Sequence, residues 1–262
     1  MNRIENKFIE LRKAKKKAFI AFITAGFPDL KTTKELILEF DRIGVDIIEL
    51  GVPFSDPLAD GPIIQEATHF ALKKGVSLLK ILQLVKSVRM QVRMPICLMT
   101  YYNPVFCYGE EKFARQAARS GVDGVIISDL PPEEAKLLVK YLNRYGIDNI
   151  NFLAPTSSNA RIEYVSRQAQ GFIYYVSLTG VTGERKKIAL DLNANLRRIK
   201  KYTTKPVCVG FGVSTKKQVK EIQRKADGVI VGSAIVHKIK ENIGRSDVTQ
   251  RVSSFVSSLK GS

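Results

Sequence analysis

The stretch that decides the fold and the function is IIELGVPFSDPLADGPII, residues 47–64. It opens with a short apolar run that contains Glu49, and a loop rich in proline, glycine and aspartate follows. Apolar residues followed by such breakers predict a buried strand that runs into a rigid turn. A carboxyl group at the end of a buried strand is costly to desolvate, so it needs a partner or a task. The loop then supplies a second acid, Asp60.

We interpret Glu49 and Asp60 as two acids in unlike surroundings. A pocket floor carrying Glu49 and a loop bringing Asp60 over it would give the two carboxyl groups different pKa values, which is how one site obtains both an acid and a base. The alternative is an ordinary acid at a strand end followed by a turn aspartate. Taken alone, the stretch supports both interpretations about equally.

Length and composition indicate a globular protein. The chain has 262 residues, 45% of them hydrophobic, which fits one large α/β barrel or two small domains. No apolar run approaches the roughly 20 residues needed to cross a bilayer. The amino end carries no apolar signal segment, so we expect the protein in the cytoplasm.

The cysteines and histidines do not form a metal-binding pattern. Cys97, Cys107 and Cys208 are scattered and odd in number, which argues against a disulfide framework or a zinc site. His69 and His237 each lie in a helical pattern far from any acid cluster. We therefore expect no metal.

The charge balance is strongly positive, with 42 basic and 25 acidic residues and a net charge of +17. Such a balance raises nucleic acid as a partner. The basic residues are dispersed, however, and no aromatic-interleaved groove or known nucleic-acid motif accompanies them. A basic surface that attracts anionic substrates explains the charge more simply, so we expect no specific nucleic-acid partner and no membrane.

Eight short apolar runs alternate with segments of helical spacing. Continuous apolar runs are what a parallel sheet buried on both faces requires. The runs cover residues 19–24, 47–50, 96–100, 124–128, 150–154, 172–176, 206–209 and 228–231. This alternation predicts an α/β fold, a (β/α)8 TIM barrel, as a single domain over residues 1–262 with a short N-terminal helix. The alternative is an open doubly wound sheet, but no Gly-x-Gly-x-x-Gly opens a helix after the first run.

Glycine-rich turns follow the last two predicted strands. The sequences are VGFGVS at residues 209–214 and VGSAIV at residues 231–236. Glycine lets backbone amides approach an anion closely, and a helix start favours negative charge. Because barrels often bind phosphate at these two loops, the pair predicts a phosphate site.

A segment with two glycines and a charged continuation, residues 177–187, follows the sixth predicted strand. It fits a mobile lid over the site. An ordinary flexible loop would have the same composition.

Together these segments resemble the tryptophan synthase α subunit family over essentially the whole chain. The signature is LGVPFSDPLADGP at residues 50–62, and it is long and specific. Supporting motifs are FITAG at residues 22–26, MTYYNP at 99–104, DLP at 129–131, GVTG at 180–183 and GFG at 210–212.

The resemblance implies a carbon–carbon lyase reaction, the retro-aldol cleavage of indole-3-glycerol phosphate into indole and glyceraldehyde 3-phosphate. It implies no cofactor in this subunit. In the family, the indole passes to a β subunit that carries pyridoxal phosphate and makes L-tryptophan, within an αββα heterotetramer. A different phosphate-binding barrel, such as a pentose-phosphate epimerase or a thiamine-phosphate synthase, is one alternative. A non-catalytic subunit that only activates a β partner is another.

The resemblance also implies roles for individual residues. Glu49 is expected to move the protons, and Asp60 to accept the indole N–H and stabilise positive charge on the ring. The residues that match the indole pocket are Phe22, Met99, Tyr101, Ile126, Leu153, Tyr174 and Phe211. Those that match the phosphate contacts are Gly183, Gly212, Gly232 and Ser233, and Thr182 matches the lid residue that approaches Asp60. The expected β-facing surface comprises the loop at 53–60 and the turns at 103–106 and 129–131.

Overall fold

The computed structural model describes residues 2–177, 185–210 and 212–260, with the side chains of 185–191 left out of the description. Eight parallel strands close into a barrel in sequence order, and β1 pairs with β8. The strands are β1 (Ala18–Thr24), β2 (Ile47–Gly51), β3 (Ile96–Thr100), β4 (Gly124–Ile127), β5 (Asp148–Leu153), β6 (Ile173–Val176), β7 (Val207–Gly210) and β8 (Gly228–Val231). The predicted TIM barrel is confirmed.

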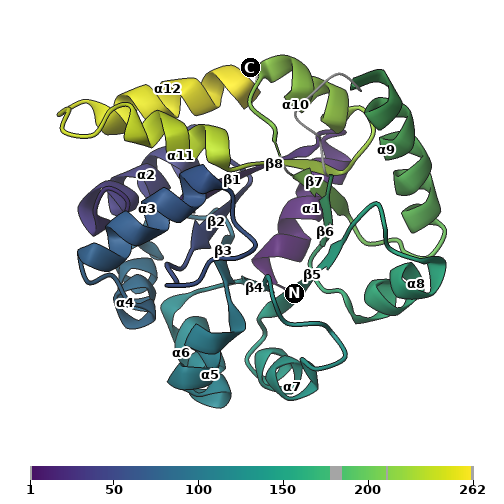
Figure 1. Cartoon of the computed structure of the whole chain (residues 1–262), viewed down its shortest axis with the longest axis horizontal. Helices are drawn as coiled ribbons and strands as arrows, with labels where there is room; N and C mark the ends of the chain where they lie inside the picture. Colours follow the sequence, from purple (N-terminus) through teal and green to yellow (C-terminus); the bar gives the residue numbers. More distant parts are fainter. Residues whose placement is uncertain (1, 178–184, 211, 261–262) are drawn as a thin grey trace.

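Helices surround the ring of strands (Figure 1). They are α1 (Arg3–Lys13), α2 (Leu30–Arg42), α3 (Pro62–Lys73), α4 (Leu78–Val88), α5 (Tyr102–Tyr108), α6 (Glu110–Ser120), α7 (Lys136–Arg144), α8 (Asn159–Gln168), α9 (Arg185–Lys200), α10 (Lys216–Gln223), α11 (Ser233–Lys240) and α12 (Val248–Lys260). The connection from β2 to β3 contains two helices, α3 and α4, and so does the connection from β3 to β4, with α5 and α6. The charged residues from Arg185 onward, expected to continue the lid, instead begin α9.

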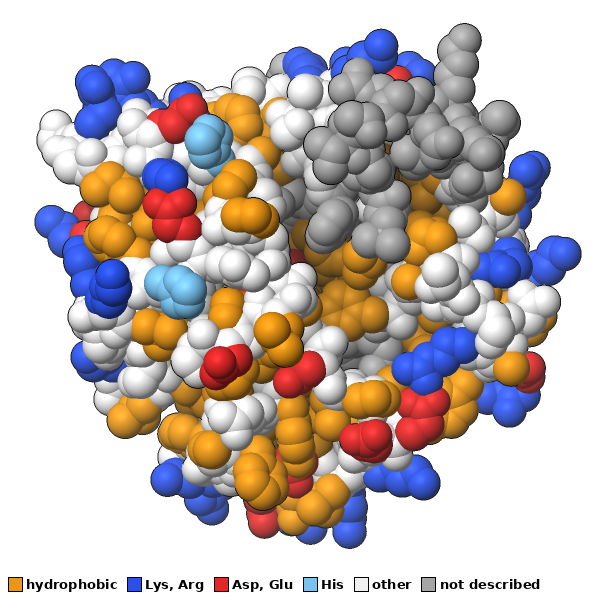
Figure 2. Space-filling view, in the orientation of Figure 1, with side chains coloured by type: hydrophobic (Ala, Val, Ile, Leu, Met, Phe, Trp, Pro, Cys, Tyr) orange, Lys and Arg blue, Asp and Glu red, His pale blue; other side chains and the backbone are white. Residues whose placement is uncertain are grey.

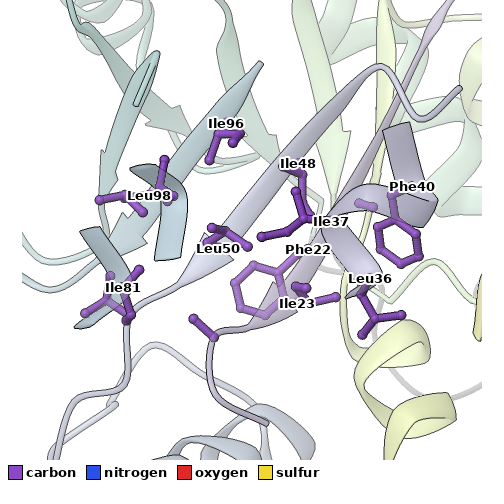
Figure 3. Close-up of a cluster of buried hydrophobic side chains, with 14 of the residues drawn as sticks. Phe22, Ile23, Leu36, Ile37, Phe40, Ile48, Leu50, Ile81, Ile96 and Leu98 are labelled. Atoms are coloured by element: carbon purple, nitrogen blue, oxygen red, sulfur yellow. The ribbon is translucent and has the colours of Figure 1, made fainter. Parts of the chain in front are cut away.

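The core has an outer layer between strands and helices. Side chains of β1, β2 and β3 pack there against α2 and α4, as Figure 3 shows for Ile23, Ile48 and Leu98 among others. These strands are buried along almost their whole length, because helices cover one face and the barrel interior fills the other. This explains the continuous apolar runs of the sequence.

The barrel interior forms a second cluster, and α1 closes its amino end. Ile4, Phe8 and Leu11 of α1 are buried in the same cluster as Ile20 and Ile150 of the strands. In Figure 1, α1 is seen through the ring of strands. The interior is therefore packed at the end where the strands begin, and a site can open only where they finish.

A buried ion pair fixes the connections at this amino end. The Arg89 guanidinium donates to Asp123 Oδ2 at 3.2 Å, to Val92 O at 2.6 Å and to Met94 O at 2.9 Å. Asp123 also accepts the Ile96 N–H at 2.9 Å. Side-chain exposure is only 9% for Arg89 and 4% for Asp123, so each charge depends on the other and on these bonds.

We expect Arg89→Met to lower the free energy of unfolding by about 3 kcal/mol or more, because it removes one partner of a buried pair. The matched control is Arg144→Met, since Arg144 pairs with Glu111 at 3.0 Å on the surface with side-chain exposures of 60% and 47%. An exposed pair contributes about 0–1 kcal/mol, so the control should stay close to wild type. Urea unfolding measures both changes, and equal losses would contradict this view of the Arg89 pair.

Candidate active site

Glu49 points into the barrel interior from β2. Its neighbours in register are Phe22 on β1 and Cys97 on β3. The side chain is fully buried, and neither carboxyl oxygen has a hydrogen-bond partner among the described residues. A buried, unpaired carboxyl group is costly, so the fold sacrifices stability to place it there.

Burial also changes the acidity of Glu49. Desolvation raises its pKa from 4.5 to about 8, because a charged carboxylate is disfavoured away from water. A carboxyl group with such a pKa holds a proton at neutral pH and releases it readily. That is the property required of a group that both donates and accepts protons during a reaction.

Asp60 reaches the same end of the barrel from the loop that follows β2. The Tyr101 hydroxyl donates to Asp60 Oδ2 at 3.1 Å and accepts the Ala59 N–H at 3.0 Å. Burial raises the pKa of Asp60, and the hydrogen bond from Tyr101 opposes that rise. Asp60 is half-buried and hydrogen-bonded, whereas Glu49 is fully buried and unpaired, so the expected difference in surroundings is present.

The structure brings the two acids to one place. A cavity at the end where the strands finish is lined by Phe22, Thr24, Gly51, Val52, Asp60, Ile64, Thr68, Met99 and Ser128. Glu49 is the neighbour in register of Phe22, which lines this cavity together with Asp60. Figure 2 shows a central hollow with a hydrophobic floor and acidic side chains along one edge.

Of the residues expected in the indole pocket, Phe22 and Met99 line this cavity. Met99, Ile126 and Tyr174 belong to the interior cluster. The Phe22 ring lies over Gly51, since a Cβ added there would come within 2.6 Å of it. The Tyr101 hydroxyl is hydrogen-bonded to Asp60, which lines the cavity. Phe211 lies outside the described residues.

The expected position of Leu153 in the indole pocket is wrong. Its side chain packs outside the barrel with Ile162 and Val165 of α8. The interior position on β5 belongs to Phe152, whose ring centroid lies 4.9 Å from that of Tyr174. Successive side chains of a strand point to opposite faces, so the inward-facing Ile150 implies Phe152 and excludes Leu153. That alternation was the signal in the sequence that could have identified Phe152.

The expected phosphate residues lie on loops at the same end. Gly232 precedes α11 and Ser233 is its first residue, and the helical bonds begin with Ile235 N–H to Gly232 O at 2.8 Å. The amides before that bond are directed outward from the helix start, where negative charge is favoured. Gly212 is exposed after β7 with φ of +70°, a conformation that glycine adopts without strain. Gly183 and the lid residue Thr182 lie outside the described residues.

Within the described residues, no group of three or more histidine, cysteine or acidic side chains could hold a metal ion. None of the described helices has the length and apolar character required to cross a bilayer.

The comparisons with known proteins agree with this geometry. The sequence profile of the family described as "Tryptophan synthase alpha chain" matches residues 8–261. This chain belongs to that family. The tryptophan synthase alpha chain of Geotalea uraniireducens is 50% identical over 260 residues, covering 99% of this chain and 97% of that protein. That of Thermoanaerobacter sp. is 45% identical, covering 99% of both.

Solved structures of the family share the fold. Tryptophan synthase subunit alpha from Legionella pneumophila superposes with a TM-score of 0.92 at 36% identity, covering 99% of this chain and 97% of that one. An open form of tryptophan synthase from M. tuberculosis gives a TM-score of 0.89 at 32% identity, covering 99% and 97%. Family members are tryptophan biosynthetic lyases, so the cavity at the carboxyl ends of the strands is the candidate active site.

The raised pKa of Glu49 predicts how stability depends on pH. The unfolded chain loses this proton near pH 4.5 and the folded chain near pH 8, so stability falls as pH rises between these values. Glu49→Gln should remove this contribution. The difference in free energy of unfolding between the variant and wild type should therefore shift in favour of the variant by up to about 1.4 kcal/mol per pH unit as pH rises across that window.

Urea unfolding at pH 5 and pH 8 measures the change. The control is Glu221→Gln, since Glu221 is exposed on α10 and should show no such trend. Parallel pH dependences for wild type and Glu49→Gln would show that Glu49 is not held protonated by burial.

Proposed function

We propose that this chain cleaves indole-3-glycerol phosphate to indole and glyceraldehyde 3-phosphate by a retro-aldol reaction. The observation that carries the proposal is the fully buried Glu49 carboxyl, unpaired among the described residues, on the strand position next to Phe22, which lines a cavity together with Asp60. The family is that of the tryptophan synthase α chain, and Phe22, Val52, Ile64 and Met99 give the cavity an apolar wall on which an indole ring is proposed to rest.

Glu49 is the group proposed to move the protons. Because its pKa is raised to about 8, it starts protonated and gives its proton to C3 of the indole ring. The resulting carboxylate takes the proton of the C3′ hydroxyl. The bond between C3 and C3′ then breaks, its electron pair returns to the ring to restore indole, and C3′ becomes the aldehyde carbon of glyceraldehyde 3-phosphate.

Asp60 is proposed to stabilise the intermediate. Protonation at C3 places positive charge on the ring nitrogen, and a carboxylate that accepts the N–H lowers the energy of that charge. Tyr101 already donates to Asp60 Oδ2 at 3.1 Å, which holds the carboxylate in place and favours its ionised form. Unlike Glu49, Asp60 is only half-buried and has a hydrogen-bond donor that opposes the rise of its pKa on burial.

The phosphate is proposed to bind away from the acids, at Gly212, Gly232 and Ser233. The start of α11 offers backbone amides and a favourable dipole to a dianion. Binding there anchors the glycerol phosphate chain and leaves the indole directed into the cavity. From the resemblance in sequence alone, Gly183 is proposed as a further phosphate contact and Thr182 as the lid residue that approaches Asp60.

A β subunit is the partner expected of a family member, and we propose an αββα assembly in the cytoplasm. The pyridoxal phosphate would belong to that partner. The proposed contact surface contains the exposed apolar residues Leu58 and Phe106, which are 92% and 63% exposed. Asp56 is exposed on the same loop as Leu58 and could pair with a basic residue of the partner. Exposed apolar side chains grouped near a site are typical of an interface.

Replacing either acid should abolish most of the cleavage. Glu49→Gln cannot transfer protons and should reduce turnover by about 10²–10⁴-fold, the usual contribution of acid–base catalysis. Asp60→Asn keeps the shape but loses the charge, and should cost about 10²–10³-fold. Indole release from indole-3-glycerol phosphate measures the rate, and ligand binding should persist. Undiminished turnover in either variant would remove that residue from the mechanism.

The phosphate site predicts a charge-specific defect at Gly212. Gly212→Asp should raise KM by roughly tenfold or more, since about 1.4 kcal/mol of repulsion from the phosphate suffices for that change. Gly212→Asn is the matched control, because it has the same size and backbone preference without the charge. Equal KM values for the two variants would show that phosphate does not bind beside Gly212.

A further inference from the structure

The loop that carries Asp60 is tied to the fold by a glutamine outside the proposed catalytic pair. Gln65 lies in the first turn of α3, and its Nε2 donates to Asp60 O at 2.9 Å and to Pro57 O at 3.4 Å. Both acceptors are carbonyl oxygens, so only the NH2 end of the amide can face them. The orientation of this side chain is therefore set by its surroundings.

Gln65 bridges the two ends of one tight turn. The Asp60 N–H donates to Pro57 O at 3.1 Å, which closes the turn, and the Gln65 amide spans the same two residues from the helix side. Tyr101 also contacts the turn, through the Ala59 N–H and the Asp60 carboxylate. Asp60 is thus held at its main chain from α3 and at its side chain from the end of β3.

Apolar packing holds only part of this loop: Pro57 is buried and the Phe54 ring centroid lies 5.2 Å from that of Tyr101, but the tip is exposed. Ser55 and Asp56 are exposed, and Leu58 at the tip is 92% exposed. Where side chains are not packed, the position of the backbone depends on its hydrogen bonds. The bonds from Gln65 and Tyr101 therefore add to this packing and help to set where Asp60 stands in the isolated chain.

We propose that Gln65 is a positioning residue for Asp60, holding the catalytic loop in its working place before a β subunit docks on the exposed tip. The proposal rests on the proposed role of Asp60. A docked partner would restrain the same loop at Leu58 and so supply part of the restraint that Gln65 gives.

The geometry predicts which kinetic constant depends on Gln65. The proposed phosphate residues Gly212 and Gly232 lie on the loops after β7 and β8, and Gln65 does not bond to them. A misplaced Asp60 should therefore slow the chemical step and leave substrate binding nearly unchanged. Small errors in the placement of a reacting group are costly to rate.

The test compares Gln65→Met with wild type as the isolated chain and with saturating β subunit. Methionine keeps the length of the side chain but cannot donate. We expect kcat of the isolated chain to fall by about tenfold, KM for indole-3-glycerol phosphate to change less than about twofold, and the partner to restore most of kcat. Gln91→Met is the matched control, since Gln91 Nε2 donates to Ser87 O at 3.2 Å after α4, and it should behave as wild type.

A second measurement keeps the proposal testable without turnover. Amide hydrogen exchange at Ala59 and Asp60 should be about tenfold faster in Gln65→Met and unchanged in Gln91→Met, because loosening the turn exposes these N–H groups. Three results would each overturn the positioning role. They are a kcat of Gln65→Met equal to that of wild type, a loss of kcat that is the same with and without the β subunit, and unchanged hydrogen exchange at Ala59 and Asp60. If wild type itself releases no indole, the proposed function fails, and the exchange data still decide whether Gln65 holds the loop.

Discussion

The structure depends on one constraint, a carboxyl group that is excluded from water inside the barrel. Glu49 is fully buried and has no hydrogen-bond partner among the described residues. Water cannot reach it from the amino end, because Ile4, Phe8 and Leu11 of α1 fill that opening. Its affinity for a proton is raised for the same reason. The destabilising burial and the proposed proton transfer are thus two consequences of a single placement.

A comparison with other buried acids explains why this placement indicates function. Asp123 is buried as well, but Arg89, Arg3 and the Ile96 N–H bind its carboxylate, so it stabilises the amino end. Asp148 resembles Glu49 more closely, since burial raises its pKa to about 7 and its Oδ2 lacks a described partner. It lies beside Gly171 and Ile4, however, at the closed end of the barrel. Of these three buried acids, Glu49 alone stands near the open end, where barrel enzymes bind substrate.

The proposed site divides its tasks between rigid and adjustable elements. Glu49 sits on a strand paired on both sides, so its position is fixed by the barrel itself. Asp60 sits on a loop held by a few polar contacts and exposed at its tip. This arrangement allows an event on the surface, such as the docking of a partner, to reach one acid without disturbing the other. The residues proposed to bind phosphate lie on other loops, after β7 and β8.

The barrel and the identity of the two acids could be predicted from the sequence. Continuous apolar runs follow from strands covered on both faces, and this local signal predicted all eight strands. The same signal did not separate the two faces of β5, which is why Leu153 was chosen where Phe152 points inward. The predicted alternation of one helix per strand also did not include a second helix between β3 and β4, where the structure has α5 and α6.

Only the tertiary structure showed what holds each acid. Tyr101 lies 41 positions from Asp60 in the chain, yet its hydroxyl binds that carboxylate. The absence of any described partner for Glu49 is likewise a property of the packed interior. A sequence determines which side chains alternate along an element, because that depends on near neighbours. The water, charges and donors around a group depend on residues brought together by folding, so acidity and positioning were decided by the barrel.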